Sequence, residues 1–151
     1  MSILCFKLIK LIGLVIIGIS IISCYDDLEE INTENKQISI TGIPSSYNSR
    51  MYEIYLSADN PNLNLMEAGI FNGSYNIFKG SVSGNSINAS SDWNGFGSFN
   101  IILVFPYAVT NAGGYRDTKY EIFRFSNGTY NIKDTKSIIS FNSFSKYTPS
   151  Y

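Results

Sequence analysis

Histidine is absent from this 151-residue chain, and cysteine occurs only twice. The missing histidine excludes Ser-His-Asp triads, His-ligated zinc or haem, and pH switches based on imidazole. Eleven basic residues against 12 acidic ones leave a net charge of −1, unlike the basic composition of nucleic-acid-binding proteins. We therefore expect no nucleic-acid partner. The length suits one domain, or at most two very small ones.

The first 23 residues differ in composition from the rest. Lys7 and Lys10 precede an uncharged apolar run over residues 11–23, which at 13 residues is shorter than the roughly 20 that cross a bilayer. A basic start, a short apolar stretch and a small residue at its end are typical of a secretory signal peptide. We therefore predict that residues 1–23 are a signal peptide and no part of the folded domain.

A cysteine directly follows the apolar run. The segment Ile21-Ile22-Ser23-Cys24 resembles the lipobox of bacterial lipoproteins, although leucine is commoner than isoleucine at its first position. The resemblance implies cleavage between Ser23 and Cys24 and a diacylglyceryl thioether on Cys24, usually with acylation of the new amino group. Two or three acyl chains would anchor the protein stably to a membrane. The alternatives are an ordinary signal peptide that ends in Ser-Cys and an uncleaved signal anchor.

This assignment accounts for both cysteines. Cys5 lies in the segment predicted to be removed, and Cys24 would carry lipid. The mature chain would then have no free thiol, so neither a disulfide framework nor cysteine catalysis is expected. Beyond the covalent lipid on Cys24, we predict no cofactor and no metal.

An acidic segment separates Cys24 from the first β pattern. Residues 25–36 contain five acids and one base, Lys36, and lack apolar periodicity. Together with Cys24 they are expected to form a flexible tether, 24–36, whose length when extended is at most about 40 Å. A short helix over 27–31 is the alternative. The folded domain is expected over 37–151.

Apolar residues in the predicted domain recur with a period of two, which indicates strands. The run from Phe99 to Phe105 is apolar on both faces, so it predicts a buried central strand that Pro106 would end. No segment after residue 36 shows a helical stripe with caps. The other expected strands are 38–41, 52–57, 66–71, 75–80, 119–126, 129–133 and 136–144.

Turn signals support the same fold class. Asn-Gly pairs begin at Asn72, Asn94 and Asn127, and this dipeptide suits type I′ hairpin turns. The first and third pairs lie between predicted strands. Seven or eight short strands with frequent turns predict an all-β fold, a single antiparallel β-sandwich of immunoglobulin-like or transthyretin-like kind. A small β-barrel is the alternative.

Two segments of the domain resemble parts of known lipoproteins. Residues 38–44, Ile-Ser-Ile-Thr-Gly-Ile-Pro, and 139–144, Ile-Ser-Phe-Asn-Ser-Phe, look like the first and last strands of small β-modules in lipoproteins of spirochaetes, especially treponemes. The resemblance covers most of the domain in pattern but only these segments in residues. Those modules mostly lack an assigned activity, so it implies a β fold and no particular function.

Candidate catalytic groups are sparse. Acids at polar positions of the strand alternation are expected to lie on a solvated face. The loop 59–67 has proline and leucine where a calcium loop needs oxygen ligands, and neither 95–100 nor 111–114 completes a phosphate-binding loop. An enzymatic site is therefore not expected. The acids in or near predicted strands are Glu53, Glu67, Asp92, Asp117 and Glu121.

Aromatic residues make up 15% of the chain and include 11 tyrosines. Trp93, Phe96 and Tyr115 lie near glycines that suit turns, so they are the candidate binding residues, in loops expected at one end of the sandwich. The alternative places Trp93 and Phe96 as plugs that close the end of the core.

Together these features predict a non-enzymatic, lipid-anchored protein of the bacterial cell envelope, held outside the cytoplasm on a membrane. Its partners would be the membrane, through the lipid, and a protein or glycan bound by the β-sandwich. A structural or assembly subunit of an envelope complex is the first alternative, and a bare sheet edge would favour it. A hydrolase or inhibitor is the second alternative.

Overall fold

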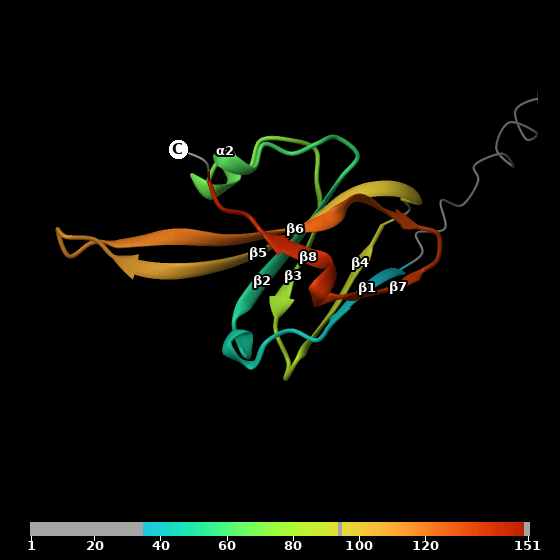
Figure 1. Ribbon diagram of the computed structural model, residues 1–151, viewed down its shortest axis with the longest axis horizontal. Coiled ribbons are helices and arrows are strands. Elements are labelled where there is room, and N and C mark those ends of the chain that lie inside the picture. Colours follow the sequence, from blue (N-terminus) through green and yellow to red (C-terminus); the bar gives the residue numbers. More distant parts are fainter. Residues whose placement is uncertain (1–34, 94, 150–151) are drawn as a thin grey trace, which may run out of the picture. The chain divides into compact units, whose positions relative to one another are not determined.

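Two β-sheets face each other in the computed structural model, which describes residues 35–93 and 95–149 (Figure 1). The expected all-β sandwich of about eight strands is therefore confirmed, and the alternative of a closed barrel is wrong, because the described strands form two open sheets. The smaller sheet has the order β4 (Ser86–Asp92), β1 (Asn35–Thr41), β7 (Lys136–Ser140). The larger has the order β3 (Asn76–Ser81), β2 (Met51–Ser57), β5 (Gly97–Thr110), β6 (Arg116–Ile132), β8 (Phe144–Lys146).

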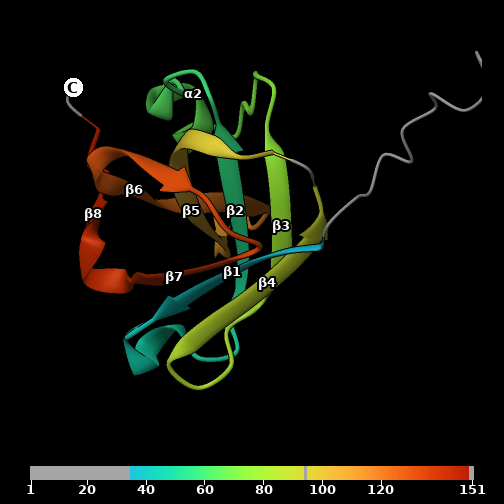
Figure 2. The ribbon, with the colours of Figure 1, turned by 90° about the vertical axis from the view of Figure 1, so that its right-hand side faces the viewer.

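Nearly all neighbouring strands run antiparallel, as predicted. The exception is the β1–β7 pair, which is parallel with Ile38 opposite Ser137 and Ile40 opposite Ile139. In Figure 2 the small sheet lies in front of β2 and β3 and its strands cross theirs at an angle. The remaining elements are the short 3₁₀ turns η1 (Ser45–Tyr47) and η2 (Phe141–Ser143) and the helix α2 (Leu63–Glu67).

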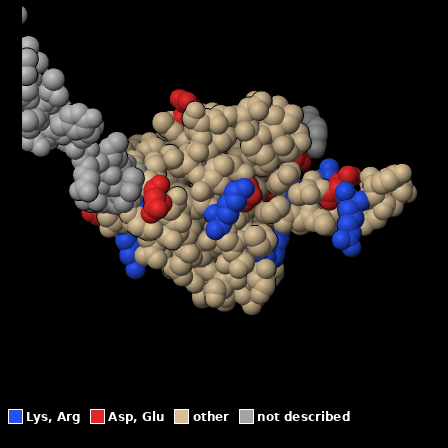
Figure 3. Space-filling view, turned by 180° about the vertical axis from the view of Figure 1, so that it is seen from behind, with Lys and Arg blue, Asp and Glu red and all other residues tan. Residues whose placement is uncertain are grey.

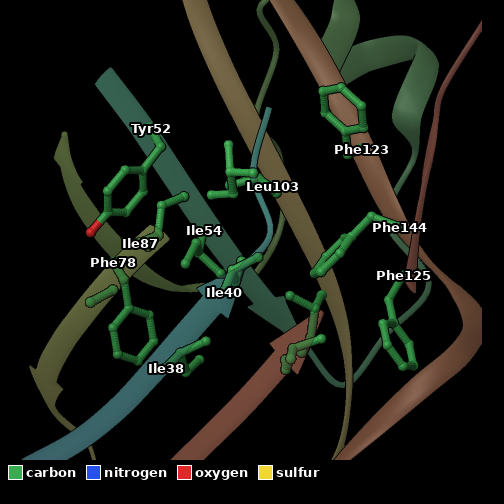
Figure 4. Close-up of a cluster of buried hydrophobic side chains, with 14 of the residues drawn as sticks. Ile38, Ile40, Tyr52, Ile54, Phe78, Ile87, Leu103, Phe123, Phe125 and Phe144 are labelled. Carbon is green, nitrogen blue, oxygen red and sulfur yellow. The ribbon is translucent and has the colours of Figure 1, made fainter. Parts of the chain in front are cut away.

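The main core lies between the two sheets. Alternate residues of each strand point into it, so that Ile38 and Ile40 of β1 meet Ile54 of β2 and Leu103 of β5 (Figure 4). These four side chains are at most 1% exposed. The apolar residues that alternate in the sequence therefore form one continuous layer between the sheets. Burial of this layer is the main stabilising contribution to the fold.

A second apolar cluster covers the opposite face of the larger sheet. Ile102 and Val104 of β5 point away from the main core and pack under Leu63 and Met66 of helix α2. This explains why the run from Phe99 to Phe105 is apolar on both faces, and its predicted role as a central strand is confirmed.

The predicted strand over 66–71 is wrong, because the helix α2 occupies part of it. Asn62 caps this helix by accepting a hydrogen bond from the backbone N–H of Leu65 at 3.2 Å. Leu63 and Met66, spaced three apart, then share the buried side. Five helical residues are too few to show a helical period, so Met66, Ala68 and Ile70 give the appearance of strand alternation.

Pro106 does not end β5, which continues to Thr110. Pro106 lies opposite Tyr120 of β6, and its ring nitrogen faces away from β6. On that side β2 pairs with β5 only as far as Val104. No ladder hydrogen bond is lost there among the described strands, which is why a proline is tolerated.

The third Asn-Gly pair lies inside a strand instead of a hairpin turn. The segments 119–126 and 129–133, predicted as separate strands, belong to β6, which runs through Gly128. Asn100 pairs with Thr129 and Ile102 with Arg124, so the register shifts at this point, and Gly128 has φ +82°. The positive φ that suits a hairpin turn serves a β-bulge here.

The first described strand begins two residues before the predicted start of the domain. β1 starts at Asn35, and Lys36, expected in the tether, is only 1% exposed. Its Nζ lies 3.2 Å from the centre of the Phe96 ring. The predicted signal peptide, the predicted cleavage and lipidation site at Ser23 and Cys24, and the rest of the predicted tether lie outside the described residues.

Candidate functional site

The structure does not bring Trp93, Phe96 and Tyr115 together. Trp93 and Phe96 lie in the connection from β4 to β5, whereas Tyr115 lies in the turn from β5 to β6. These turns flank opposite ends of the 14-residue strand β5, which spans roughly 40 Å (Figure 1). The three residues therefore form no common recognition surface at one end of the sandwich.

Trp93 is part of the core. It is half-buried and packs edge-on against Phe99, with ring centres 4.9 Å apart, and against Phe78 at 6.5 Å. Phe96 is 53% exposed but is stacked under the buried ammonium of Lys36. The alternative of a core plug thus describes Trp93 correctly and Phe96 only in part.

Tyr115 belongs to a long two-stranded arm. We call residues 106–120 the arm: the outer ends of β5 and β6 and the turn between them, which projects from the rest of the domain (Figure 1). The turn is organised by Asn111, whose Oδ1 accepts hydrogen bonds from the backbone N–H groups of Gly113 and Tyr115, both at 3.0 Å. Tyr115 at its tip is 75% exposed.

The outer edge of β6 in the arm has no partner strand among the described residues. β8 pairs with β6 only from Phe123 to Phe125, and the last contact is the N–H of Tyr147 donating to the carbonyl of Ile122. Backbone groups alternate sides along a strand, and the register with β5 is regular here. The N–H and C=O groups of Tyr120, Thr118 and Arg116 therefore also point to this outer edge.

A groove of about 510 Å³ lies at the base of this edge. We call it the edge groove. Arg50 and Tyr107 line it from the core side of the larger sheet, and Glu67 and Tyr120 from the side of helix α2. The C-terminal segment, Lys146 to Pro149, forms another wall, and a second hollow of about 440 Å³ lies along the same segment. The groove is thus lined by tyrosine rings and charged groups where the sheet edge becomes free.

Glu121 is the centre of the groove's charges. Its carboxylate accepts hydrogen bonds from the Tyr47 hydroxyl at 2.9 Å, Arg50 at 3.0 Å and Lys146 at 2.5 Å. Burial alone would raise the pKa of Glu121, but the hydrogen bonds from Lys146, Tyr47 and Arg50 outweigh it and hold the pKa below its ordinary value. Burial and the same hydrogen bond raise the pKa of Tyr47 to about 12.

Of the other acids noted in the sequence, Glu67 also lines the edge groove, whereas Glu53 and Asp117 lie away from Glu121. Glu53 lies on the opposite face of the larger sheet, where it accepts from Lys79 at 2.8 Å and from the Tyr55 hydroxyl. Asp117 accepts from Asn111 on the arm. The sheet therefore separates the two most buried strand carboxylates. In the described part of the chain, no three His, Cys, Asp or Glu side chains gather as a metal site would require.

Sequence reasoning missed the arm and the edge groove. The strand over 119–126 was expected to begin at Lys119, whereas β6 begins at Arg116. A usable signal was present: residues 107–119 combine strand-forming side chains with no apolar face, as expected for a ribbon solvated on both sides. Tyr47, Arg50 and Lys146 carry no such signal, because only the tertiary fold brings them to Glu121.

Comparisons with known proteins add no relatives. No protein-family model matches the chain, and searches of curated proteins and of solved structures give no significant match. Within residues 35–93 and 95–149, no helix is both long and apolar enough to cross a bilayer.

Proposed function

We propose that this chain is a non-enzymatic lipoprotein of the bacterial cell envelope, anchored through lipid on Cys24, that binds a protein partner along the outer edge of β6. The anchor rests on the sequence Ile21-Ile22-Ser23-Cys24 after a basic start and a short apolar run. The binding role rests on one observation, the edge of the arm that pairs with no described strand and has the groove at its base.

A protein partner fits this edge better than a glycan. The edge offers backbone donors and acceptors at the regular spacing of a strand, which another strand matches and a sugar does not. The tyrosines of the groove, Tyr107 and Tyr120, would add contacts with side chains, since aromatic groups are enriched at protein interfaces. The same edge supports the second candidate role, a subunit of an envelope assembly.

The anchor is tested by mass spectrometry of the membrane fraction. We expect the mature chain to begin at Cys24 with acyl groups on it. A Cys24→Ala variant should keep residues 1–23 and carry no lipid. Wild-type protein that retains Met1, or a Cys24→Ala variant with the same lipid mass, would contradict the anchor.

Binding is tested by placing a photo-crosslinking residue at Lys119, on the arm, in the full chain in membranes. The matched control places the residue at Ser90, an exposed position of β4 in the smaller sheet. We expect a discrete protein adduct from position 119 that is absent from position 90. Equal adducts from both positions, or none from either, would overturn the proposal.

A further inference from the structure

We propose that the outer edge of β6 over Arg116–Tyr120 pairs with the same edge of a second copy of this chain, antiparallel about a two-fold axis at Thr118. This inference rests on the proposed binding role of the arm and names the partner. Strand pairing would join the two larger sheets into one continuous sheet across both molecules.

The outer edge of β6 has every backbone donor and acceptor needed to pair with another strand, whereas the outer edge of β5 lacks one donor. Thr118 and its neighbours at two-residue intervals present both N–H and C=O outward, as the bond from Tyr147 to Ile122 fixes their phase. On β5 the corresponding outward edge contains Pro106, which has no N–H to donate. The arm therefore offers one complete edge among the described strands.

Charge order selects a single register. In an antiparallel pair, outward-pointing residues face outward-pointing residues, and side chains directly opposite lie on the same face. An axis at Thr118 places Asp117 opposite Lys119 of the second copy, and Lys119 opposite Asp117. An axis at Asp117 or at Lys119 would instead place like charges opposite each other.

The register shifted by two residues, with its axis at Tyr120, is blocked by the C-terminal segment of the domain. An axis at Tyr120 would require the backbone of Ile122, but its carbonyl already accepts from Tyr147. With the axis at Thr118, the pairs Thr118–Thr118 and Arg116–Tyr120 supply about six backbone hydrogen bonds. Arg116 would then lie beside the Tyr120 ring, a favourable cation–π pairing.

Charged residues on a free edge usually prevent pairing between copies. Here Arg116, Asp117 and Lys119 are exposed and both signs alternate along the arm (Figure 3). Asp117 and Lys119 lie on either side of Thr118. In the proposed register each therefore faces the opposite charge of the second copy, whereas the edge of a different strand would meet unmatched charges. The paired stretch is short, so the dimer would be weak in solution and favoured where lipid anchors concentrate the chain on a membrane.

Disulfide trapping of the full chain on membranes tests the pairing. Residues opposite each other at the axis have Cα atoms about 5.5 Å apart, within the range that a disulfide spans. We expect Thr118→Cys to give a covalent dimer on mild oxidation. Ala108→Cys, which lies directly across the arm on β5 and is also exposed, should not. The unsubstituted chain controls for Cys5 and Cys24.

Charge reversal in the Thr118→Cys background tests the register. Asp117→Lys alone and Lys119→Asp alone should each lower the dimer yield at least about fivefold, because like charges then face each other twice. An equal mixture of the two variants should restore the yield as heterodimer, since every opposed pair is again of opposite sign. This rescue would be absent if either substitution had unfolded the arm.

Equal dimer yields from Thr118→Cys and Ala108→Cys, or a mixture that stays as low as the single variants, would overturn the inference. A Thr118→Cys adduct with a different protein but not with itself would overturn the inference and leave the proposed binding function standing. No arm-specific adduct of either kind would overturn both.

Discussion

Replacing Glu121 by Gln should destabilise the domain by about 2 kcal/mol at pH 7. The glutamine keeps the shape of the side chain, but it loses the charge and turns an amide NH₂ toward groups that donate hydrogen bonds. The partners of Glu121 should contribute unequally to stability, because the side chain of Lys146 is 58% exposed and that of Arg50 is 28% exposed. The Lys146 pair should contribute roughly 0–1 kcal/mol and the hydrogen bonds from Arg50 and Tyr47 most of the rest.

The same cluster predicts a pH dependence with a definite sign. Because the folded protein lowers the pKa of Glu121, its stabilising contribution is complete above the unfolded-state pKa of about 4.3 and is lost as the pH falls through the folded-state value. The difference between wild type and Glu121→Gln should therefore shrink as the pH falls below the unfolded-state pKa, because the wild-type carboxyl becomes protonated and loses the charge that glutamine also lacks.

Urea unfolding of residues 25–151, followed by tryptophan fluorescence, measures this difference. The midpoint should fall with little change in the slope m, since the exposed surface is unaltered. Asp117→Asn is the matched control on the same strand, because Asp117 is exposed, and it should cost under about 0.5 kcal/mol. A loss no greater than that of Asp117→Asn, or one of equal size at pH 2 and pH 7, would refute the reasoning.

Four further substitutions test the fold. Leu103→Asp should unfold the domain, seen as loss of the β signal in far-UV circular dichroism, because an unpaired charge in a fully buried strand costs several kcal/mol. Gly128→Val should lower the free energy of unfolding in urea by about 1–2 kcal/mol, since φ +82° strains a branched side chain. Trp93→Ala should cost about 2–3 kcal/mol and Phe96→Ala under about 1, because Trp93 packs on the core and Phe96 is half exposed. Since Trp93 is the only tryptophan, far-UV circular dichroism follows the unfolding of this pair. Equal losses for the last pair would contradict that distinction.

The sequence predicts the sandwich well because both sheets bury one face against the other. Period-two alternation is then a direct consequence of packing, and it places β1, β2, β3 and the central part of β5 correctly. The strand boundaries are predicted wrongly where the same residue type occurs in two different backbone settings. Gly128 supplies positive φ to a bulge instead of a hairpin, and Pro106 lies at a free edge instead of a strand end.

The candidate site could not be predicted in the same way. Glu121 meets Tyr47 and Arg50 from positions 74 and 71 residues away, and Lys146 from 25 residues away. No local pattern encodes such a meeting, because each residue taken singly has the polar character of a solvated face. Aromatic content pointed to Tyr115 at the arm's tip but gave no indication that one edge of the arm lacks a partner among the described strands.

The Glu121 cluster also bears on binding, because of where it lies. A two-stranded ribbon alone is only marginally stable in water, so an arm of this length needs support at its base. Glu121 follows the last residue of the arm, and its partners come from η1, the residue just before β2 and the end of β8. These contacts tie the arm to three separate segments of the domain. A base held in this way would lower the entropy lost if the outer edge of β6 pairs with another strand, as proposed, so the charge cluster would support the proposed binding.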